Sequence, residues 1–461
     1  MPNYLFNIES KKVKFIKTKY RYIKTKIPAS GTKQILNSLY KKESRSMHGQ
    51  LPIVWKEAKD CFVKDIGGNQ FIDFTSTIFV TNTGHSNKRV FNYMKREMSK
   101  NLISSYAYAN EIREKYISKL IKSSPVGIQK AFLLSSGTET TEAAYKLIKM
   151  YGKKIKKRRQ GIICFEGNWH GRTLAAQMMS WNKSQKEWIS RKDKDIHFLE
   201  FPYPWKLKNT DPVIFLKKNL ENLEKKGINL KKDVAGFMLE TFQGWGAIFY
   251  PKTFVKEIRK IANKNNILLA FDEMQAGFAR TGKFFGFQNY DVSADIVCCG
   301  KGMGGGVPLS GVLGKAKVLD LPSTGNMSST HSANPLCCAA GLAVLEEIEK
   351  KKLVKKAYKK GKILKKRLED FKKKFPNNIS HIFSKGLIGA ILFKKKKNVE
   401  ANIVASKIVE ECMKSGLLVV HTGRESIKIG PPLTISKEIL IEGLNVIESS
   451  IESILNKNDK N

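Results

Sequence analysis

The chain has 461 residues, well beyond the roughly 250–300 residues at which single hydrophobic cores stop growing, so we expect two lobes. A hydrophobic content of 41% and a charged content of 27% place it with soluble globular proteins. The formal net charge of +42 favours, on its own, an anionic partner. However, the lysines are spread along the whole chain without the interleaved aromatic residues of a single-strand binding groove, so a nucleic-acid partner is not expected.

The N-terminal residues lack an apolar core of signal-peptide length, and no apolar run approaches the roughly 18 residues of a membrane span. We therefore expect a cytoplasmic protein without membrane contact. The seven cysteines are scattered and show no CxxC spacing. This pattern predicts reduced thiols and gives no indication of a metal site.

Residues 1–45 are basic and irregular, with a short helical pattern after Ser30. A strand-rich stretch begins at Pro52, and Gly67-Gly68-Asn69 predicts the turn of an antiparallel hairpin. Apolar residues at helical spacing, with lysines opposite, predict one amphipathic helix through residues 345–371. A further αβ pattern covers residues 386–420. We expect residues 1–80 and 341–461 to form a smaller lobe and residues 81–340 the larger one.

A buried strand from Ala131 is predicted to lead into a helix through Ser136, Gly137 and Thr138. The backbone N–H groups at such a helix start favour a phosphate, through both their direction and the helix dipole. An ordinary helix capped by serine or threonine has a similar sequence, so both interpretations stay open at this point.

Two short apolar runs, 267–271 and 296–299, read as buried parallel strands and are followed by Asp272 and Lys301. Ligands collect at the carboxyl ends of such strands, so we expect both side chains in one crevice. The glycines around Lys301 allow positive φ and close approach to a ligand. A lysine there can form a Schiff base with an aldehyde, and an aspartate can keep a heteroaromatic nitrogen protonated. Pyridoxal phosphate needs these two groups, although singly they also fit a turn cap and a surface lysine.

The stretch 267–306 resembles the signature of the subgroup III, fold type I pyridoxal-phosphate aminotransferases. The residues that match in order are Asp272, Glu273, Gln275, Gly277, Arg280, Thr281, Gly282 and Lys301. Four further motifs resemble the family in the same order: 136–142 (S-G-[AS]-E-A), 167–173 (G-x-[FY]-H-G-x-T), 240–244 (E-P-[IV]-Q-G) and 330–335 (T-[FY]-x-G-N-P). The resemblance covers nearly the whole chain from about residue 50.

The resemblance implies an α/β fold: a large domain with a mostly parallel central sheet flanked by helices, and a smaller α+β domain built from both termini. It also implies pyridoxal 5'-phosphate as the cofactor. Lys301 would act as general base and acid on the substrate carbon, and Asp272 would pair with the ring nitrogen. The remaining cofactor-binding residues implied are Trp169 (stacking on the ring), His170, Gln275 (phenolic oxygen), and Ser136, Gly137 and Thr138 (phosphate).

Thr330 resembles a threonine that reaches the phosphate of the neighbouring subunit, which implies a homodimer with shared active sites. The alternative is that Thr330 only caps the helix expected from Leu336. For Trp169, the alternative is a buried core tryptophan. His85, in a Gly-His pair that is also usual in the family, is expected to have a structural role.

The substrate-binding residues implied are Ile78, Glu240, Arg424 and Lys428. Ile78 stands where the dialkylglycine decarboxylases have a glutamine, which favours amino transfer over decarboxylation. Glu240 matches a glutamate of the ω-amino-acid enzymes. Together they favour transfer from an ω-amine such as 4-aminobutyrate to a 2-oxo acid. Lys428 replaces the usual carboxylate-binding arginine and loses its bidentate fork, with Arg424 as the alternative.

Three other functions stay open from the sequence. A glutamate-1-semialdehyde-type aminomutase and a dialkylglycine-type decarboxylating aminotransferase share the cofactor motifs. A polyanion-binding protein on the same scaffold would use the basic surface instead of the cofactor site.

Overall fold

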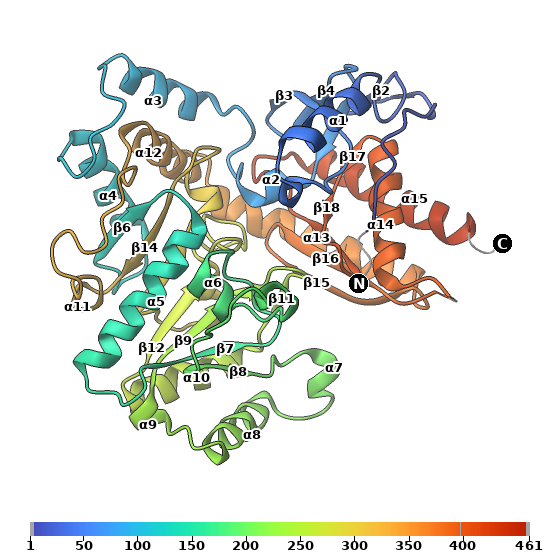
Figure 1. The fold of residues 1–461 in the computed structure, drawn as a ribbon. Coiled ribbons are helices and arrows are strands. Elements are labelled where there is room, and N and C mark those ends of the chain that lie inside the picture. Colours follow the sequence, from blue (N-terminus) through green and yellow to red (C-terminus); the bar gives the residue numbers. More distant parts are fainter. Residues whose placement is uncertain (1–3, 397, 458–461) are drawn as a thin grey trace. The chain divides into compact units, whose positions relative to one another are not determined.

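A computed structural model describes residues 4–396 and 398–457 of the chain (Figure 1). Two compact units can be distinguished. The large unit comprises Lys88–Gly244 and Ile248–Val354, and the small unit comprises Met1–Asn87, Trp245–Ala247 and Lys355–Asn461. The boundary that the sequence placed at residue 340 falls inside a helix, and the large unit continues to Val354.

The large unit is built on a seven-stranded sheet, in which only β14 runs antiparallel to its neighbours. In spatial order the strands are β6 (Lys130–Leu134), β14 (Ser310–Gly314), β13 (Ile296–Cys299), β12 (Leu268–Asp272), β9 (Val234–Glu240), β7 (Gly161–Phe165) and β8 (Ile196–Leu199). The apolar runs form the central strands because both faces of the sheet are covered. The predicted mostly parallel α/β fold is confirmed.

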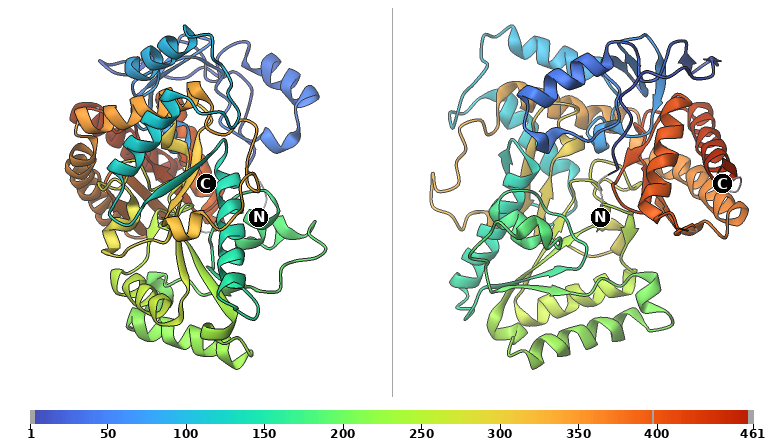
Figure 2. Two further views of the ribbon diagram at one scale, coloured as in Figure 1. Left: turned by 90° about the vertical axis from the view of Figure 1, so that its left-hand side faces the viewer. Right: turned by 45° about the vertical axis from the view of Figure 1, so that its right-hand side comes forward.

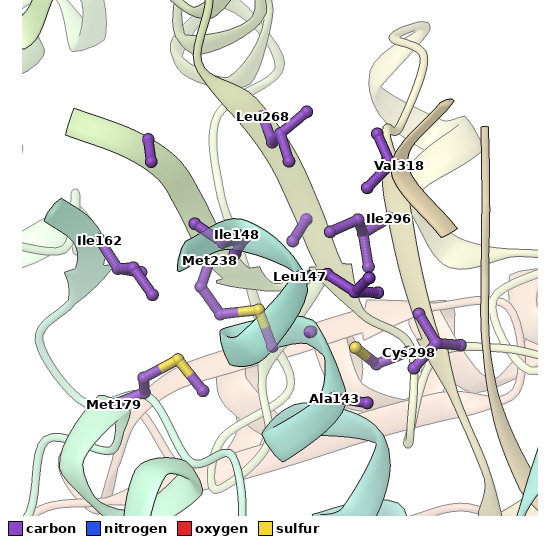
Figure 3. Close-up of a cluster of buried hydrophobic side chains, with 14 of the residues drawn as sticks. Ala143, Leu147, Ile148, Ile162, Met179, Met238, Leu268, Ile296, Cys298 and Val318 are labelled. Atoms are coloured by element: carbon purple, nitrogen blue, oxygen red, sulfur yellow. The ribbon is translucent and has the colours of Figure 1, made fainter. Parts of the chain in front are cut away.

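Helix α5 (Gly137–Lys154) covers one face of this sheet. Its Leu147 and Ile148 pack against Leu268 and Ile296 in the main hydrophobic core (Figure 3). Strand alternation points Leu269 to the other face, where α10 (Lys252–Asn265) contacts β12 and α8 (Pro212–Lys225) lies beside α10 (Figure 2). Shorter elements of the unit are α6 (Leu174–Met179), α7 (Pro204–Leu207), α9 (Leu230–Asp233), α11 (Ala316–Leu319), β10 (Phe242–Gln243) and β11 (Ile248–Phe249).

Three further helices of the large unit pack together: α3 (Lys88–Met98), α4 (Glu111–Ser123) and α12 (Pro335–Lys350). The prediction of one helix through residues 345–371 is wrong. Helix α12 ends at Lys350, Lys352 takes a left-handed φ of 51°, and a new helix, α13 (Leu353–Lys374), follows. Tyr358, expected on the buried stripe, is 56% exposed. The helical spacing continued across the break by coincidence, because the two helices bury their apolar stripes in different units.

The small unit contains residues from both ends of the chain, as predicted. Its first sheet comprises β1 (Ile16–Lys17), β2 (Tyr22–Ile23), β5 (Gln70–Asp73), β4 (Phe62–Asp65) and β3 (Trp55–Lys59), with β17 (Leu417–Leu418) parallel to β5. A second sheet comprises β15 (Ile379–Lys385), β16 (Ile388–Phe393), β19 (Ser426–Ile429) and β18 (Val420–His421). The helices are α1 (Thr32–Lys42), α2 (Ser76–Phe79), α13, α14 (Ala401–Lys414) and α15 (Lys437–Lys457).

The predicted hairpin is formed by β4 and β5, with Asp65 N–H donating to Asn69 O at 3.1 Å and Gly68 at a φ of 74°. Within residues 4–396 and 398–457, none of the helices combines the length and apolarity that crossing a bilayer requires.

Candidate active site

The carboxyl ends of three adjacent strands bring the candidate catalytic residues of the large unit together. Asp272 ends β12 and is the register partner of Glu240, which ends the parallel strand β9. On the other side, Asp272 is the register partner of Cys298 in β13, and Lys301 follows that strand by two residues. The prediction that Asp272 and Lys301 share one end of the sheet is confirmed, and Glu240 joins them.

Lys301 is half-buried and has a left-handed backbone, with a φ of 47°. Gly300 precedes it where a Cβ atom would lie 2.7 Å from the Met274 sulfur, so a side chain at that position has no room. Burial lowers the pKa of Lys301 below its ordinary value, while the Asp272 and Glu240 carboxylates act in the opposite direction. A lowered pKa increases the uncharged fraction of the amine, which is the form able to attack a carbonyl group.

Asp272 is held by two hydrogen bonds in a buried position. The Met274 N–H donates to Asp272 Oδ1 at 3.0 Å, and His170 Nδ1 lies 2.9 Å from Asp272 Oδ2. The other ring nitrogen of His170 faces the Asn168 side-chain nitrogen at 3.1 Å. Since an amide nitrogen is a donor, His170 Nε2 accepts, so the ring proton lies on Nδ1 and is donated to Asp272. His170 therefore orients the carboxylate.

Trp169 lies beside Glu240, whose Oε2 accepts a hydrogen bond from the Trp169 N–H at 3.0 Å. Glu240 Oε1 accepts from the Gly244 N–H at 3.3 Å. The guanidinium of Arg172 lies 4.7 Å from the centre of the Trp169 ring. Because the ring is half-buried and its neighbours are polar, the alternative of a core tryptophan is wrong.

The start of α5 has the chemistry of an anion site. Ser136 is the N-cap and forms a capping box with Glu139. In the part of the chain that the structure describes, the N–H groups of Gly137 and Thr138 have no acceptor, so they are available to an anion at the positive end of the helix. The Thr138 hydroxyl lies 2.7 Å from that of Thr173. These donors fit a phosphate group.

A network that the sequence did not reveal supports this end of the sheet. The Glu273 carboxylate is fully buried and accepts from the Thr241 hydroxyl and from the N–H groups of Gly286 and Phe287, the latter two at 2.7 Å. Burial raises the pKa of Glu273 to about 7. The Thr241 N–H donates to Asp272 O at 3.2 Å. Threonine in place of the usual proline therefore supplies two hydrogen bonds that proline lacks.

Gln275 is half-buried beside Gly244, where a Cβ atom would lie 2.2 Å from the Gln275 amide nitrogen. Thr330 is exposed in the segment that precedes α12. The N-cap of α12 is Asn334, whose side chain accepts from the N–H groups of Leu336 and Cys337. The alternative that Thr330 caps this helix is therefore wrong.

The remaining candidates belong to the small unit. Lys428 lies in β19, is buried, and has its Nζ 5.0 Å from the centre of the Phe79 ring. Arg424 stacks on Trp245 at 3.6 Å and pairs with Glu425 at 3.2 Å. Ile78 is 43% exposed.

His85 is buried against Asp73, with its Nε2 2.7 Å from Asp73 Oδ2. Asn168 was missed in the sequence, although its position two residues before His170 in a resembling motif could have indicated it.

A lysine and an aspartate at adjacent strand ends of a mostly parallel sheet, with an anion-binding helix start beside them, define a pyridoxal-phosphate-dependent enzyme of fold type I. The chain belongs to the class-III aminotransferases, since the sequence profile of that family (Aminotransferase class-III) matches residues 44–451. It is thus an enzyme that uses pyridoxal 5'-phosphate and acts on an amino donor and an oxo acid.

Individual proteins extend this likeness. The mitochondrial acetylornithine aminotransferase of Candida glabrata is 32% identical, over 85% of this chain and 88% of its own. The alanine/serine racemase of Pyrococcus horikoshii is 30% identical over 99% of this chain and 98% of its own. The crystal structure of the acetylornithine aminotransferase from Elizabethkingia anophelis matches with a TM-score of 0.77 and 28% identity, covering 92% of this chain and 100% of the other.

Proposed function

We propose that the enzyme transfers the amino group of an ω-amino acid to a 2-oxo acid, with Lys301 moving the proton at the substrate carbon. The observation that carries this proposal is the buried Asp272–His170 pair beside a lysine of lowered pKa. When bound, pyridoxal phosphate supplies an electron-accepting ring that stabilises negative charge on the substrate carbon. Lys301 serves as general base and then as general acid, for which a pKa below that of a free lysine is favourable.

The other cofactor-binding residues hold the ring and the phosphate. Asp272, oriented by His170, would accept a hydrogen bond from the protonated ring nitrogen, and Trp169 would stack on the ring. Gln275 would donate to the phenolic oxygen. Gly137 and Thr138 would donate to the phosphate from the start of α5, with Ser136 as its cap, and Thr330 of a second copy of the chain would complete the site. The enzyme is therefore proposed to be a homodimer.

For the substrate, Lys428 is proposed to bind a carboxylate and Glu240 to face the amine or carboxylate end, with Ile78 as an apolar wall. The relatives support an ω-amine more broadly than 4-aminobutyrate alone, because acetylornithine aminotransferases are among them. We therefore propose a donor whose reacting amine is separated from a carboxylate by several carbon atoms. Arg424 is the alternative carboxylate ligand.

A second candidate function is amino-acid racemisation. The Pyrococcus horikoshii racemase aligns with 99% of this chain, and thus with most of the residues ahead of position 44, where the match to the family profile begins. Racemisation uses the same lysine chemistry, since a proton leaves the substrate carbon and returns to it, but no amino group is passed to an oxo acid.

The test is a set of single-turnover reactions of the purified enzyme with pyridoxal phosphate. Candidate amines, including 4-aminobutyrate, ornithine, N-acetylornithine and L-alanine, are added separately, and the cofactor absorption is followed. Conversion to the pyridoxamine form, reversed by a 2-oxo acid, is expected with the ω-amines. Loss of optical rotation without that conversion would favour the racemase. Formation of an isomeric amine without any added acceptor would favour an aminomutase.

A further inference from the structure

The four-residue segment labelled α2, Ser76–Phe79, is a left-handed turn and not a regular α-helix, and its residue types disfavour this backbone. All four residues have positive φ, at 47°, 50°, 59° and 69°. None of them is glycine, and Ile78 carries a β-branched side chain. Consecutive left-handed L-residues are rare because the Cβ atom crowds the following carbonyl group. Such strain persists only where the surroundings enforce it, and it concentrates at functional sites.

Asp73 fixes the beginning of the turn. Its Oδ1 accepts from the Thr75 N–H at 2.7 Å and from the Thr75 hydroxyl at 2.6 Å, and its Oδ2 accepts from the Ser76 N–H at 3.0 Å. The same Oδ2 lies 2.7 Å from the buried His85 ring. The carboxylate is therefore fully engaged in holding the chain where it enters the left-handed region.

Both the first and the last residue of the turn contact the segment after β19. The Ser76 hydroxyl donates to Gly430 O at 2.7 Å, and the Gly430 N–H donates to Phe74 O at 2.8 Å. A Cβ atom on Gly430 would lie 2.0 Å from the Phe79 ring, so the ring packs directly on this backbone. Two residues earlier, Lys428 places its Nζ 5.0 Å from the centre of the same ring.

The two sides of the turn thus differ. Phe79 is buried at 1% exposure beneath the Lys428 ammonium, whereas the neighbouring Ile78 is 43% exposed. Thr77 and Ile78 line a pocket of about 270 Å³ together with Leu51, Trp55 and Val420. An ordinary right-handed turn at these residues would not place Phe79 under Lys428 and Ile78 in the pocket wall, because the direction of each side chain follows the backbone.

We propose that this strained turn is a specificity device, in which Phe79 is a positioning residue that fixes the Lys428 ammonium for a substrate carboxylate. The attraction of a cation to a ring face orients the flexible lysine side chain and limits its reach. The inference rests on the proposed function, since it takes Lys428 as the carboxylate ligand. A lysine lacks the rigid fork of an arginine, so Lys428 needs a second group to orient its ammonium. The Phe79 ring, held in place by the strained turn, is that group.

The main test compares substrates with and without a carboxylate in Phe79→Leu. KM for 2-oxo acids is expected to rise roughly fivefold to tenfold, because one cation–ring contact is lost, while kcat should change little. The rate with a carboxylate-free amine such as 1-aminobutane should change less than about twofold. The matched control is Phe71→Leu, at a fully buried phenylalanine of the same unit in β5. This variant should change neither KM for 2-oxo acids nor the rate with the carboxylate-free amine selectively. An equal effect of Phe79→Leu on both substrates would reduce Phe79 to a packing role and overturn the proposal.

Thr77→Gly tests the strain itself, because glycine adopts the left-handed turn without the Cβ clash. Its melting temperature should rise while KM for 2-oxo acids is retained. The control is Lys156→Gly, at an exposed residue of the large unit with a φ of 56°, which should raise the melting temperature similarly. Absence of any rise in Thr77→Gly alone would contradict a strained turn.

Lys428→Met separates this inference from the proposed function. A raised KM in Lys428→Met without one in Phe79→Leu defeats the inference alone. Unchanged KM in both variants defeats Lys428 as the carboxylate ligand, and no amino transfer by the unmodified enzyme defeats the proposed function as a whole.

Discussion

The candidate residues of the large unit lie at the ends of adjacent parallel strands, whereas those of the small unit lie on a strained turn and an antiparallel strand. In the large unit, Asp272 and Glu240 are register partners, and their positions follow from the sheet itself. In the small unit, Lys428 and Ile78 depend on hydrogen bonds between residues far apart in sequence. From this difference we propose a division, in which Lys301 and Asp272 of the large unit are needed for any amine to react, whereas Lys428 and Ile78 of the small unit contribute to substrate choice.

The largest expected effect tests the first half of this division. Lys301→Ala should lower the single-turnover rate with every amine by about a thousandfold or more, because the general base and acid is removed. The measurement is the rate of the cofactor's absorption change in rapid mixing. Lys283→Ala, at an exposed lysine, is the control and should retain the rate. A Lys301→Ala enzyme that still turns over at the unmodified rate would exclude Lys301 as the catalytic residue.

A smaller reduction of the single-turnover rate is expected when Asp272 or His170, the residues assigned to the ring nitrogen, is replaced. Asp272→Asn should reduce the single-turnover rate by at least about a hundredfold, since an amide does not hold a proton on the ring nitrogen as a carboxylate does. His170→Phe should reduce it roughly tenfold, the effect of one hydrogen bond to a charged group. Both reductions should be equal for all donors. If His170→Phe altered the preference among donors, the histidine would belong to substrate selection instead.

The raised pKa of Glu273 predicts that the stability of the protein, and not its substrate choice, depends on pH. Its pKa is raised from 4.5 to about 7 by burial, so between these values the folded state retains a proton that the unfolded state loses. The stability from this group is complete below about pH 4.5 and is lost as the pH rises from there through about 7, by on the order of 3 kcal/mol. Thermal unfolding of the cofactor-free protein at a series of pH values measures it.

Glu273→Gln should remove this component, and Glu221→Gln, at an exposed residue, should leave it unchanged. Thr241→Val should shift the loss to higher pH, because the threonine hydroxyl stabilises the charged carboxylate and lowers its pKa. A pH profile that is the same in Glu273→Gln and in the unmodified protein would place the titration elsewhere.

Sequence patterns were informative where a structure is determined by a short stretch of chain. The apolar runs before Asp272 and Lys301 predicted two neighbouring buried strands, and Gly67-Gly68-Asn69 predicted the hairpin, since strand burial and turn geometry are local properties. The left-handed turn at Thr77 contains no glycine that would have indicated positive φ from the sequence. Its stabilising partner Gly430 is also remote in sequence. The contact between Thr241 and Glu273 likewise joins two strand ends that only the folded sheet brings together.

The two cations of the small unit are expected to differ, and Arg424→Ala has the smallest expected effect of these variants. Lys428→Met should raise KM for 2-oxo acids roughly tenfold, because a buried charge opposite the carboxylate is lost, while kcat with a carboxylate-free amine stays the same. Arg424→Ala should change the same KM by less than about twofold, since its guanidinium is already engaged by Trp245 and Glu425, and should cost about 0.5–1 kcal/mol of stability. Steady-state kinetics of both variants with one acid and one carboxylate-free amine decide between them. If Arg424→Ala raised KM as much as Lys428→Met, the carboxylate would be shared by both residues, and the ring beneath Lys428 would no longer be sufficient to explain substrate choice.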